Sequence, residues 1–157
     1  MEDTHFIEIY ERYKTLVFRI AFSYVKEREV AEDVMQSVFL KFYRKPPRDE
    51  ENLSAYLAVV TKNLSIDFLR RKKIEKRAIL GIERDASLSH SVCDEWNVLQ
   101  AVNDLPEKYS SVIRLFYYGG LSVKEVAIAL KVNENSVKKR LERARNKLKR
   151  MLEEELP

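Results

Sequence analysis

Apolar side chains recur three and four positions apart along most of this 157-residue sequence, a spacing that restricts much of the chain to amphipathic helices. The first stripe runs from Phe6 to Tyr24, the second from Ala31 to Phe42 and the third from Tyr56 to Phe68. Three glycines and four prolines are too few turn-forming residues for a many-stranded sandwich or barrel. We therefore expect an all-α fold.

The periodicity is lost between Ile74 and Asp94, where small and polar residues accumulate as they do in linkers. We predict two small helical domains, residues 1–73 and 95–157, joined by a linker at 74–94. The three N-terminal stripes can bury one common core. In the second domain, Gly119 and Gly120 end a helix, because glycine tolerates the left-handed backbone that often follows a helix C-terminus.

Composition sets only broad limits on function. A net charge of +4 and a pI near 9.1 are mildly basic and do not by themselves indicate a nucleic-acid partner. The single cysteine, Cys93, excludes an internal disulfide, and no apolar run approaches the roughly 20 residues of a membrane span. The acidic N-terminus lacks the pattern of a signal peptide, so we expect a cytoplasmic protein.

The stretch LSVKEVAIALKVNENSVKKRLERARNKLKRM predicts a helix-turn-helix. Ser122 and Glu125 form an S-x-x-E capping box at the start of its first helix, and Asn133 can cap its second. The apolar positions of the second helix face inward: Val137, Leu141, Ala144, Leu148 and Met151. Its outward face is basic, as in a recognition helix: Asn135, Lys138, Lys139, Glu142, Arg143 and Arg145. A merely solvated helix face would show the same charges.

Three segments in order together resemble the extracytoplasmic-function group of bacterial sigma factors, in the sigma-70 family. AEDVMQSVFLKFYRK is similar to conserved region 2.2, and SAYLAVVTKNLSIDFLRRKK to regions 2.3 and 2.4. The segment from Leu105 to Lys149 is similar to region 4. The resemblance implies a dissociable initiation subunit of RNA polymerase with a region 2-like helical bundle and a region 4-like helix-turn-helix.

The resemblance also implies roles for residues of the first domain. Asp33 and Gln36 would contact the beta-prime clamp helices of core polymerase, although Ser37 departs from the acidic residue usual after the glutamine. Asn63 would hold an unpaired base of the −10 promoter element, in a pocket shaped by the loop from Lys45 to Ser54. Phosphate contacts would come from Arg70, Arg71 and Lys72. Tyr56 occupies a usual aromatic site, but its spacing favours core packing.

In the second domain, the implied set for the −35 element is Asn135, Lys138, Lys139, Arg140, Glu142, Arg143 and Arg145. Lysine and arginine can pair with guanine, and glutamate can accept a hydrogen bond from the cytosine amine. Arg140 and Arg145 suit phosphates better than bases. Lys131 stands in the turn where the family commonly has glycine, so its backbone would either adopt a different turn conformation or bear some strain.

The expected partners are core polymerase, through the beta-prime clamp helices and the beta subunit, promoter DNA and an anti-sigma factor. We expect a monomer with no cofactor and no small-molecule substrate. An enzyme is disfavoured because the sequence has no P-loop, dinucleotide-binding turn or HExxH motif. His90 and Cys93 fall short of the four ligands of structural zinc. A free-standing helix-turn-helix regulator, whose first domain senses a signal or dimerises, is the main alternative. A helical adaptor without a DNA role would leave the basic clusters unexplained.

Overall fold

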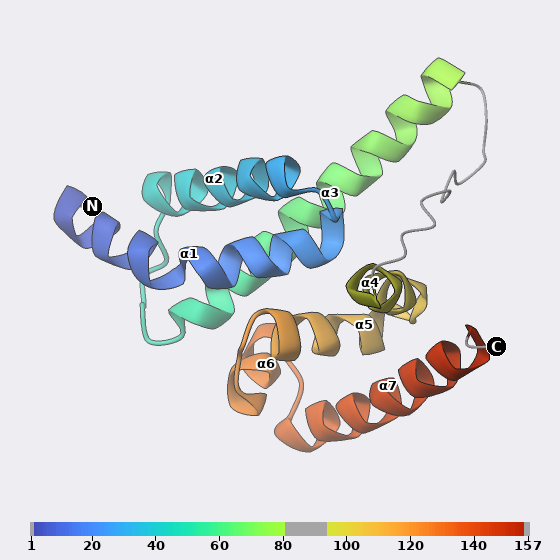
Figure 1. Cartoon of the computed structure of the whole chain (residues 1–157). Coiled ribbons are helices and arrows are strands. Elements are labelled where there is room, and N and C mark those ends of the chain that lie inside the picture. The colour runs from blue at the N-terminus through green and yellow to red at the C-terminus, as the bar shows by residue number, and fades with distance from the viewer. Residues whose placement is uncertain (1, 81–93, 156–157) are drawn as a thin grey trace.

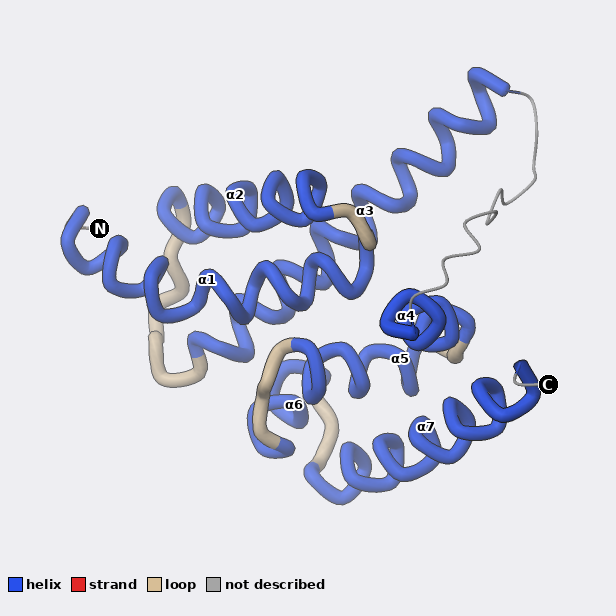
Figure 2. Tube along the Cα trace, in the orientation of Figure 1, coloured by secondary structure: helices blue, strands red, loops and turns tan. Residues whose placement is uncertain are grey.

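The structure is a computed structural model that describes residues 2–80 and 94–155, and every regular element in those two ranges is a helix (Figures 1 and 2). The all-α prediction is confirmed. The elements, in chain order, are α1 (Asp3–Val25), α2 (Arg28–Arg44), α3 (Leu53–Leu80), α4 (Asp94–Asp104), α5 (Glu107–Ile113), the π-helical turn η1 (Arg114–Tyr118), α6 (Val123–Leu130) and α7 (Glu134–Glu155).

Helices α1, α2 and α3 pack together on the apolar stripes that the sequence predicts. Val17, Ile20, Val38 and Leu57 are fully buried where the three helices meet. Tyr56 packs against this core, with its ring 6.4 Å from that of Phe42, which confirms the packing role predicted for it. Burial of such side chains contributes roughly 1.5 to 3 kcal/mol each.

Helix α3 continues to Leu80, past the predicted end of the first domain at residue 73. The segment IEKRAIL has no apolar stripe, but it consists mostly of good helix formers and contains neither glycine nor proline. The last turns of α3 project away from the rest of the molecule (Figure 1), and every side chain from 69 to 79 is exposed. His90 and Cys93 lie outside the described residues.

Helices α4 to α7 form a second cluster that contains the predicted helix-turn-helix. The Ser122 hydroxyl accepts from the Glu125 N–H at 3.1 Å, and the Glu125 carboxylate accepts from the Ser122 N–H at 3.0 Å, so the predicted capping box is confirmed. Asn133 caps α7 by accepting from the Ser136 N–H at 2.7 Å. In the turn between them Lys131 has φ 58°, the left-handed conformation that favours glycine, so of the two alternatives Lys131 bears the strain and does not adopt a different turn.

The two clusters share one continuous core, because α6 packs on the first half of α3 and η1 packs on α1. Gly119 makes this approach possible: a Cβ there would lie 2.8 Å from Cδ1 of Ile20. The guanidinium of Arg114, 4% exposed, lies 3.9 Å from the ring centroid of Tyr24. Burial raises the pKa of Tyr24 to about 12, so this tyrosine stays neutral at physiological pH.

Polar contacts border that shared core. The Ser54 hydroxyl donates to the Glu125 carboxylate, Lys26 donates to Gln100 at 2.7 Å, and Lys62 lies 3.5 Å from Glu107. No helix within residues 2–80 and 94–155 is long and apolar enough to cross a membrane.

Candidate nucleic-acid interface

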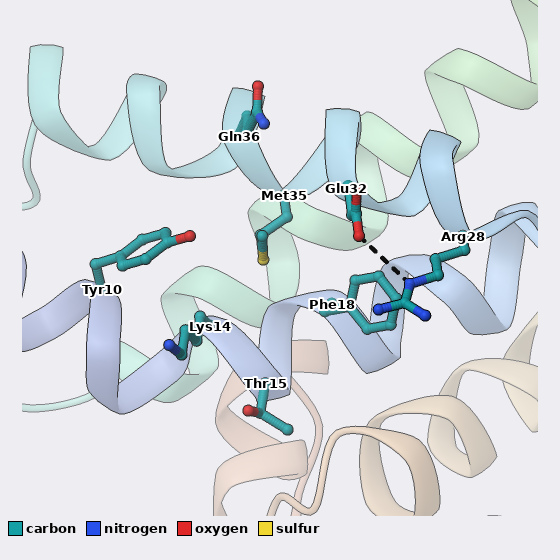
Figure 3. Close-up of a pocket in the computed structure, with 8 residues that line it drawn as sticks. All are labelled: Tyr10, Lys14, Thr15, Phe18, Arg28, Glu32, Met35 and Gln36. Atoms are coloured by element: carbon teal, nitrogen blue, oxygen red, sulfur yellow. Dashed lines mark ion pairs between the residues drawn. The ribbon is translucent and has the colours of Figure 1, made fainter.

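The two residues predicted to contact polymerase are both exposed on α2, less than one helical turn apart. Gln36 projects from α2 away from α1, whereas its neighbour Met35 points toward α1 (Figure 3). Between the two helices lies a groove of about 540 Å³ that Gln36, Arg28 and Lys14 help to line. Arg28 is engaged with Glu32 at 3.5 Å and Lys14 with Glu11 at 2.8 Å, so the groove's charges are partly neutralised locally.

Gln36 also borders a second groove, of about 590 Å³, formed by the start of α1 and the end of α2. Its rim carries three large apolar side chains that remain exposed, Ile7 at 57%, Leu40 at 48% and Tyr43 at 42%. Clustered exposed apolar groups mark protein-binding surfaces. Sequence reasoning missed this groove. The available signal was that Ile7, Leu40 and Tyr43 fall outside the stripes that form the core.

The loop between α2 and α3, predicted to shape a base pocket, is held to the N-terminus of α1. His5 Nε2 lies 2.9 and 3.0 Å from the two carboxylate oxygens of Glu50. The hydrogen bond to Glu50 raises the pKa of His5. Within the loop, the Asp49 carboxylate accepts from the Glu51 N–H at 2.8 Å.

Asn63 is exposed on α3, one position after Lys62, which reaches across to the second cluster. Arg70, Arg71 and Lys72 are also exposed, but the structure does not bring them together on one face. Lys72 turns toward Glu27, 3.4 Å away at the corner between α1 and α2. Arg70 lies 3.7 Å from Asp67 on the solvent side, in an exposed pair that contributes little to stability.

Helix α7 has the two faces predicted for it. Val137, Leu141 and Ala144 are buried, and Leu148 and Met151 are partly buried against the core. The predicted outward residues are all exposed: Asn135, Lys138, Lys139, Glu142, Arg143 and Arg145. Arg140, predicted to contact phosphates, is partly buried. At 100° per residue, Asn135, Lys139 and Glu142 lie nearest the centre of this face, and Lys138 and Arg143 lie toward its two sides.

Arg140 and Arg145 lie at opposite edges of the outward face, where side chains reach a DNA backbone more readily than base edges. Arg145 donates a 2.8 Å hydrogen bond to the Tyr117 hydroxyl. Arg145 and Tyr117 border an apolar groove of about 500 Å³, which is also lined by Val98, Ile113 and Leu152. Sequence reasoning did not predict this groove, because its walls come from three separate helical segments.

The residues present in the described ranges form no cluster of three or more histidine, cysteine or acidic side chains that could hold a metal ion. The two exposed faces, on α3 and α7, are instead basic and amide-bearing. Such groups donate to phosphates and base edges.

Comparison with known proteins identifies the same two parts of the chain. Residues 9–74 match the family model described as Sigma-70 region 2, and residues 95–148 match Sigma-70, region 4. The RNA polymerase sigma factor SigZ of Bacillus subtilis is 30% identical over 138 residues, covering 82% of this chain and 76% of SigZ. The ECF RNA polymerase sigma factor SigM of Bacillus subtilis is 30% identical over 149 residues, covering 90% of this chain and 91% of SigM.

The fold is also similar to that of a solved sigma factor. The structure of RpoE in complex with the anti-sigma factor NepR, from Bartonella quintana, matches with a TM-score of 0.73 at 22% identity and covers 95% of this chain and 97% of RpoE. At that level of identity the likeness concerns the fold.

Proposed function

The chain belongs to the extracytoplasmic-function group of the sigma-70 family, and from this premise we propose how it directs RNA polymerase to promoters. In our proposal, α2 docks on core polymerase while α3 and α7 bind the −10 and −35 promoter elements. One observation supports the proposal above all: α3 and α7 each expose a basic, amide-bearing face, and α2 exposes a separate, partly apolar face in the same molecule. No nucleotide chemistry belongs to this chain.

Core polymerase binds two surfaces in this account. Asp33 and Gln36 contact the beta-prime clamp helices, with the apolar rim of Ile7, Leu40 and Tyr43 adding buried area. The groove between α4, η1 and α7 accepts an apolar segment of the beta subunit. A buried apolar centre with polar groups at its rim is the usual anatomy of such interfaces.

Promoter contacts are divided between the two helical clusters. Asn63 holds a base of the non-template strand at the −10 element, because an amide can both donate to and accept from a base edge. Lys138, Lys139, Glu142 and Arg143 read the −35 element, Asn135 supports them near the start of α7, and Arg140 and Arg145 contact phosphates.

We also propose an anti-sigma factor as a regulatory partner, since the fold matches RpoE, which was solved bound to one. It would cover the α2 surface until a signal releases it. The free protein is a monomer in the cytoplasm, where polymerase and the chromosome are found, and it needs no cofactor. The division into 1–73, a linker at 74–94 and 95–157 stays a prediction, and the continuous α3 favours a linker that starts after Leu80.

Binding to polymerase provides the first test. We expect the full chain to form a stoichiometric complex with sigma-free core enzyme, and Asp33→Ala with Gln36→Ala to weaken it about ten-fold or more, as loss of interface hot spots does. Glu75→Ala, on the projecting end of α3, is the matched control and should leave the affinity unchanged. If the chain does not bind core polymerase but binds a palindromic DNA site as a dimer, it is a free-standing regulator instead.

A further inference from the structure

The loop between α2 and α3, residues 45–52, is short and locally stiff. Its two ends continue the backbone hydrogen bonding of the helices that flank it. The rings of Pro46 and Pro47 fix φ at two successive positions. At the tip, the Asp49 carboxylate closes a turn by accepting from the Glu51 N–H at 2.8 Å. One further contact is therefore enough to set the orientation of the whole loop.

His5 at the start of α1 supplies that contact. Its Nε2 atom lies 2.9 and 3.0 Å from the two carboxylate oxygens of Glu50. Among the described residues, this is the one hydrogen-bonded ion pair that joins the loop to α1. The pair lines a hollow of about 290 Å³, whose other walls are Glu2, Pro46 and Pro47. A single side chain of α1 therefore links the loop to the helical core.

The first turns of α1 are themselves held against the end of α2. The Phe6 ring lies edge-on to Tyr43, with ring centroids 5.1 Å apart, and 6.4 Å from the ring of the buried Phe42. The Tyr43 hydroxyl donates to the Asp3 carboxylate at 3.3 Å. His5 is therefore carried on a fixed support, and its contact with the loop transmits the position of that support.

The surroundings of His5 are negatively charged. The hydrogen bond from Glu50 raises the pKa of His5 most, and the charges of Glu50, Glu8 and Glu2 raise it further above the ordinary histidine value of about 6.5, while burial opposes them. Because the folded-state pKa is raised, the charged pair is fully formed below about pH 6.5 and weakens as the pH rises through the folded-state value. Charge-assisted hydrogen bonds are the stronger ones, so the loop is held most firmly in mild acid.

We propose that His5 is a positioning residue for the −10 pocket, which holds the loop in the orientation that shapes the pocket for one unpaired base. This inference rests on the proposed function, in which Asn63 captures that base beside the loop. His5 does not touch the base. It acts through Glu50, by limiting the orientations of the loop before DNA binds, and such pre-organisation improves the fit to one base over the other three.

Base discrimination by the reconstituted holoenzyme tests this role. The probes are fragments of one promoter whose non-template strand is unpaired at the −10 element. Each fragment carries one of the four bases at the position where Asn63→Ala loses discrimination. The measured quantity is the ratio of the affinity for the best base to the mean affinity for the other three, at pH 6 and at pH 8. Because each ratio is measured on one holoenzyme at one pH, general effects of pH on polymerase cancel.

We expect the wild-type ratio to fall about two- to five-fold from pH 6 to pH 8, the modest effect of an exposed ion pair. His5→Ala should give the low ratio at both pH values. His5→Gln keeps an N–H donor without a titrating charge, so its ratio should not change with pH and should exceed that of His5→Ala. Glu51→Gln removes an equal charge from the same loop outside the pair, and this control should follow the wild type.

Equal ratios for the wild type and His5→Ala at pH 6 would overturn the role of His5. A fall with pH in His5→Gln as large as that in the wild type would overturn it as well. If Asn63→Ala abolishes discrimination while His5→Ala leaves it unchanged, this inference fails and the proposed function stands. If the wild-type holoenzyme does not discriminate among the four bases at any unpaired position, the proposed base capture fails and this inference fails with it.

Discussion

Glu125 shows how one side chain serves both the local structure and the tertiary structure. It completes the capping box of α6 with Ser122 and also accepts a hydrogen bond from Ser54 on α3. Burial raises the pKa of the Glu125 carboxyl, but the hydrogen bonds from Ser54 and Ser122 outweigh it and hold that pKa below its usual value. The ionised carboxylate is therefore the form that stabilises the fold.

Glu125→Ala should lower the free energy of unfolding by about 1 kcal/mol at pH 7, the usual effect of losing a cap. The pKa is lower in the folded state, so this contribution is present above the ordinary glutamate value of about 4.3 and is lost as the pH falls through the folded-state value. Urea unfolding of wild type and variant between pH 3 and 7 checks this. If the difference in free energy of unfolding between wild type and Glu125→Ala stays the same as the pH falls to 3, the ionised Glu125 carboxylate does not stabilise the fold.

Gly119 is the second residue with a role between the clusters. Gly119→Ala should destabilise the protein by about 1 to 3 kcal/mol, because the new Cβ would lie 2.8 Å from Cδ1 of Ile20 and from the Leu115 carbonyl oxygen. Ile20→Val removes Cδ1, so the double variant should lose less than the sum of the single losses. Thermal unfolding of the wild type, the two single variants and the double variant measures this coupling. If the losses in stability of the single variants add up to that of the double variant, the Ile20 side chain is not what excludes a Cβ at position 119.

At the scale of elements, the sequence predicts what depends on local chemistry. Residue spacing alone predicts four features, and the structure confirms each of them: the three N-terminal stripes, the capping box, the Asn133 cap and the inward face of α7. Sequence analysis missed the continuation of α3 to Leu80, because helix propensity without an apolar stripe gives no periodic signal. It also missed the groove lined by Arg145 and Leu152, since that groove depends on tertiary neighbours. The groove beside Ile7 and Leu40 and the separation of Lys72 from Arg70, about 200° apart on the helix, were open to helical periodicity and were overlooked.

The end of α3 should behave as an independent, weakly held helix, because few packing contacts stabilise it. Ala78→Gly should speed amide hydrogen exchange in the last turns of α3 while leaving the global free energy of unfolding within about 0.5 kcal/mol. Ala144→Gly, the same change at a buried site of α7, should lower global stability. Global destabilisation by Ala78→Gly would mean that this segment packs elsewhere.

In the whole molecule, α6 packs against α3. The two DNA-binding helical clusters therefore lie too close together to reach the −10 and −35 elements at the same time. A separation of 25 base pairs between −35 and −10 spans about 85 Å. A compact chain of this length has a radius of gyration near 15 Å and a diameter of about 40 Å. The two clusters must therefore move apart when both elements are bound.

Energy transfer between dyes can follow this opening. Asn52→Cys and Lys124→Cys, in a Cys93→Ser background, place dyes beside the contact between Ser54 and Glu125. We expect high transfer efficiency in the free protein and low efficiency in the holoenzyme on promoter DNA. Unchanged efficiency would mean that the compact arrangement persists, and it would exclude simultaneous binding of both elements.

Transcription in vitro is the direct test of sigma-factor activity. Purified protein, sigma-free core polymerase and a library of genomic promoter fragments are combined, and the 5′ ends of the transcripts are sequenced. We expect transcription starts that share a spaced two-part upstream motif and that are lost with Gln36→Ala or Asn63→Ala. Failure to initiate with core polymerase, together with sequence-specific DNA binding by the protein alone, would contradict this expectation.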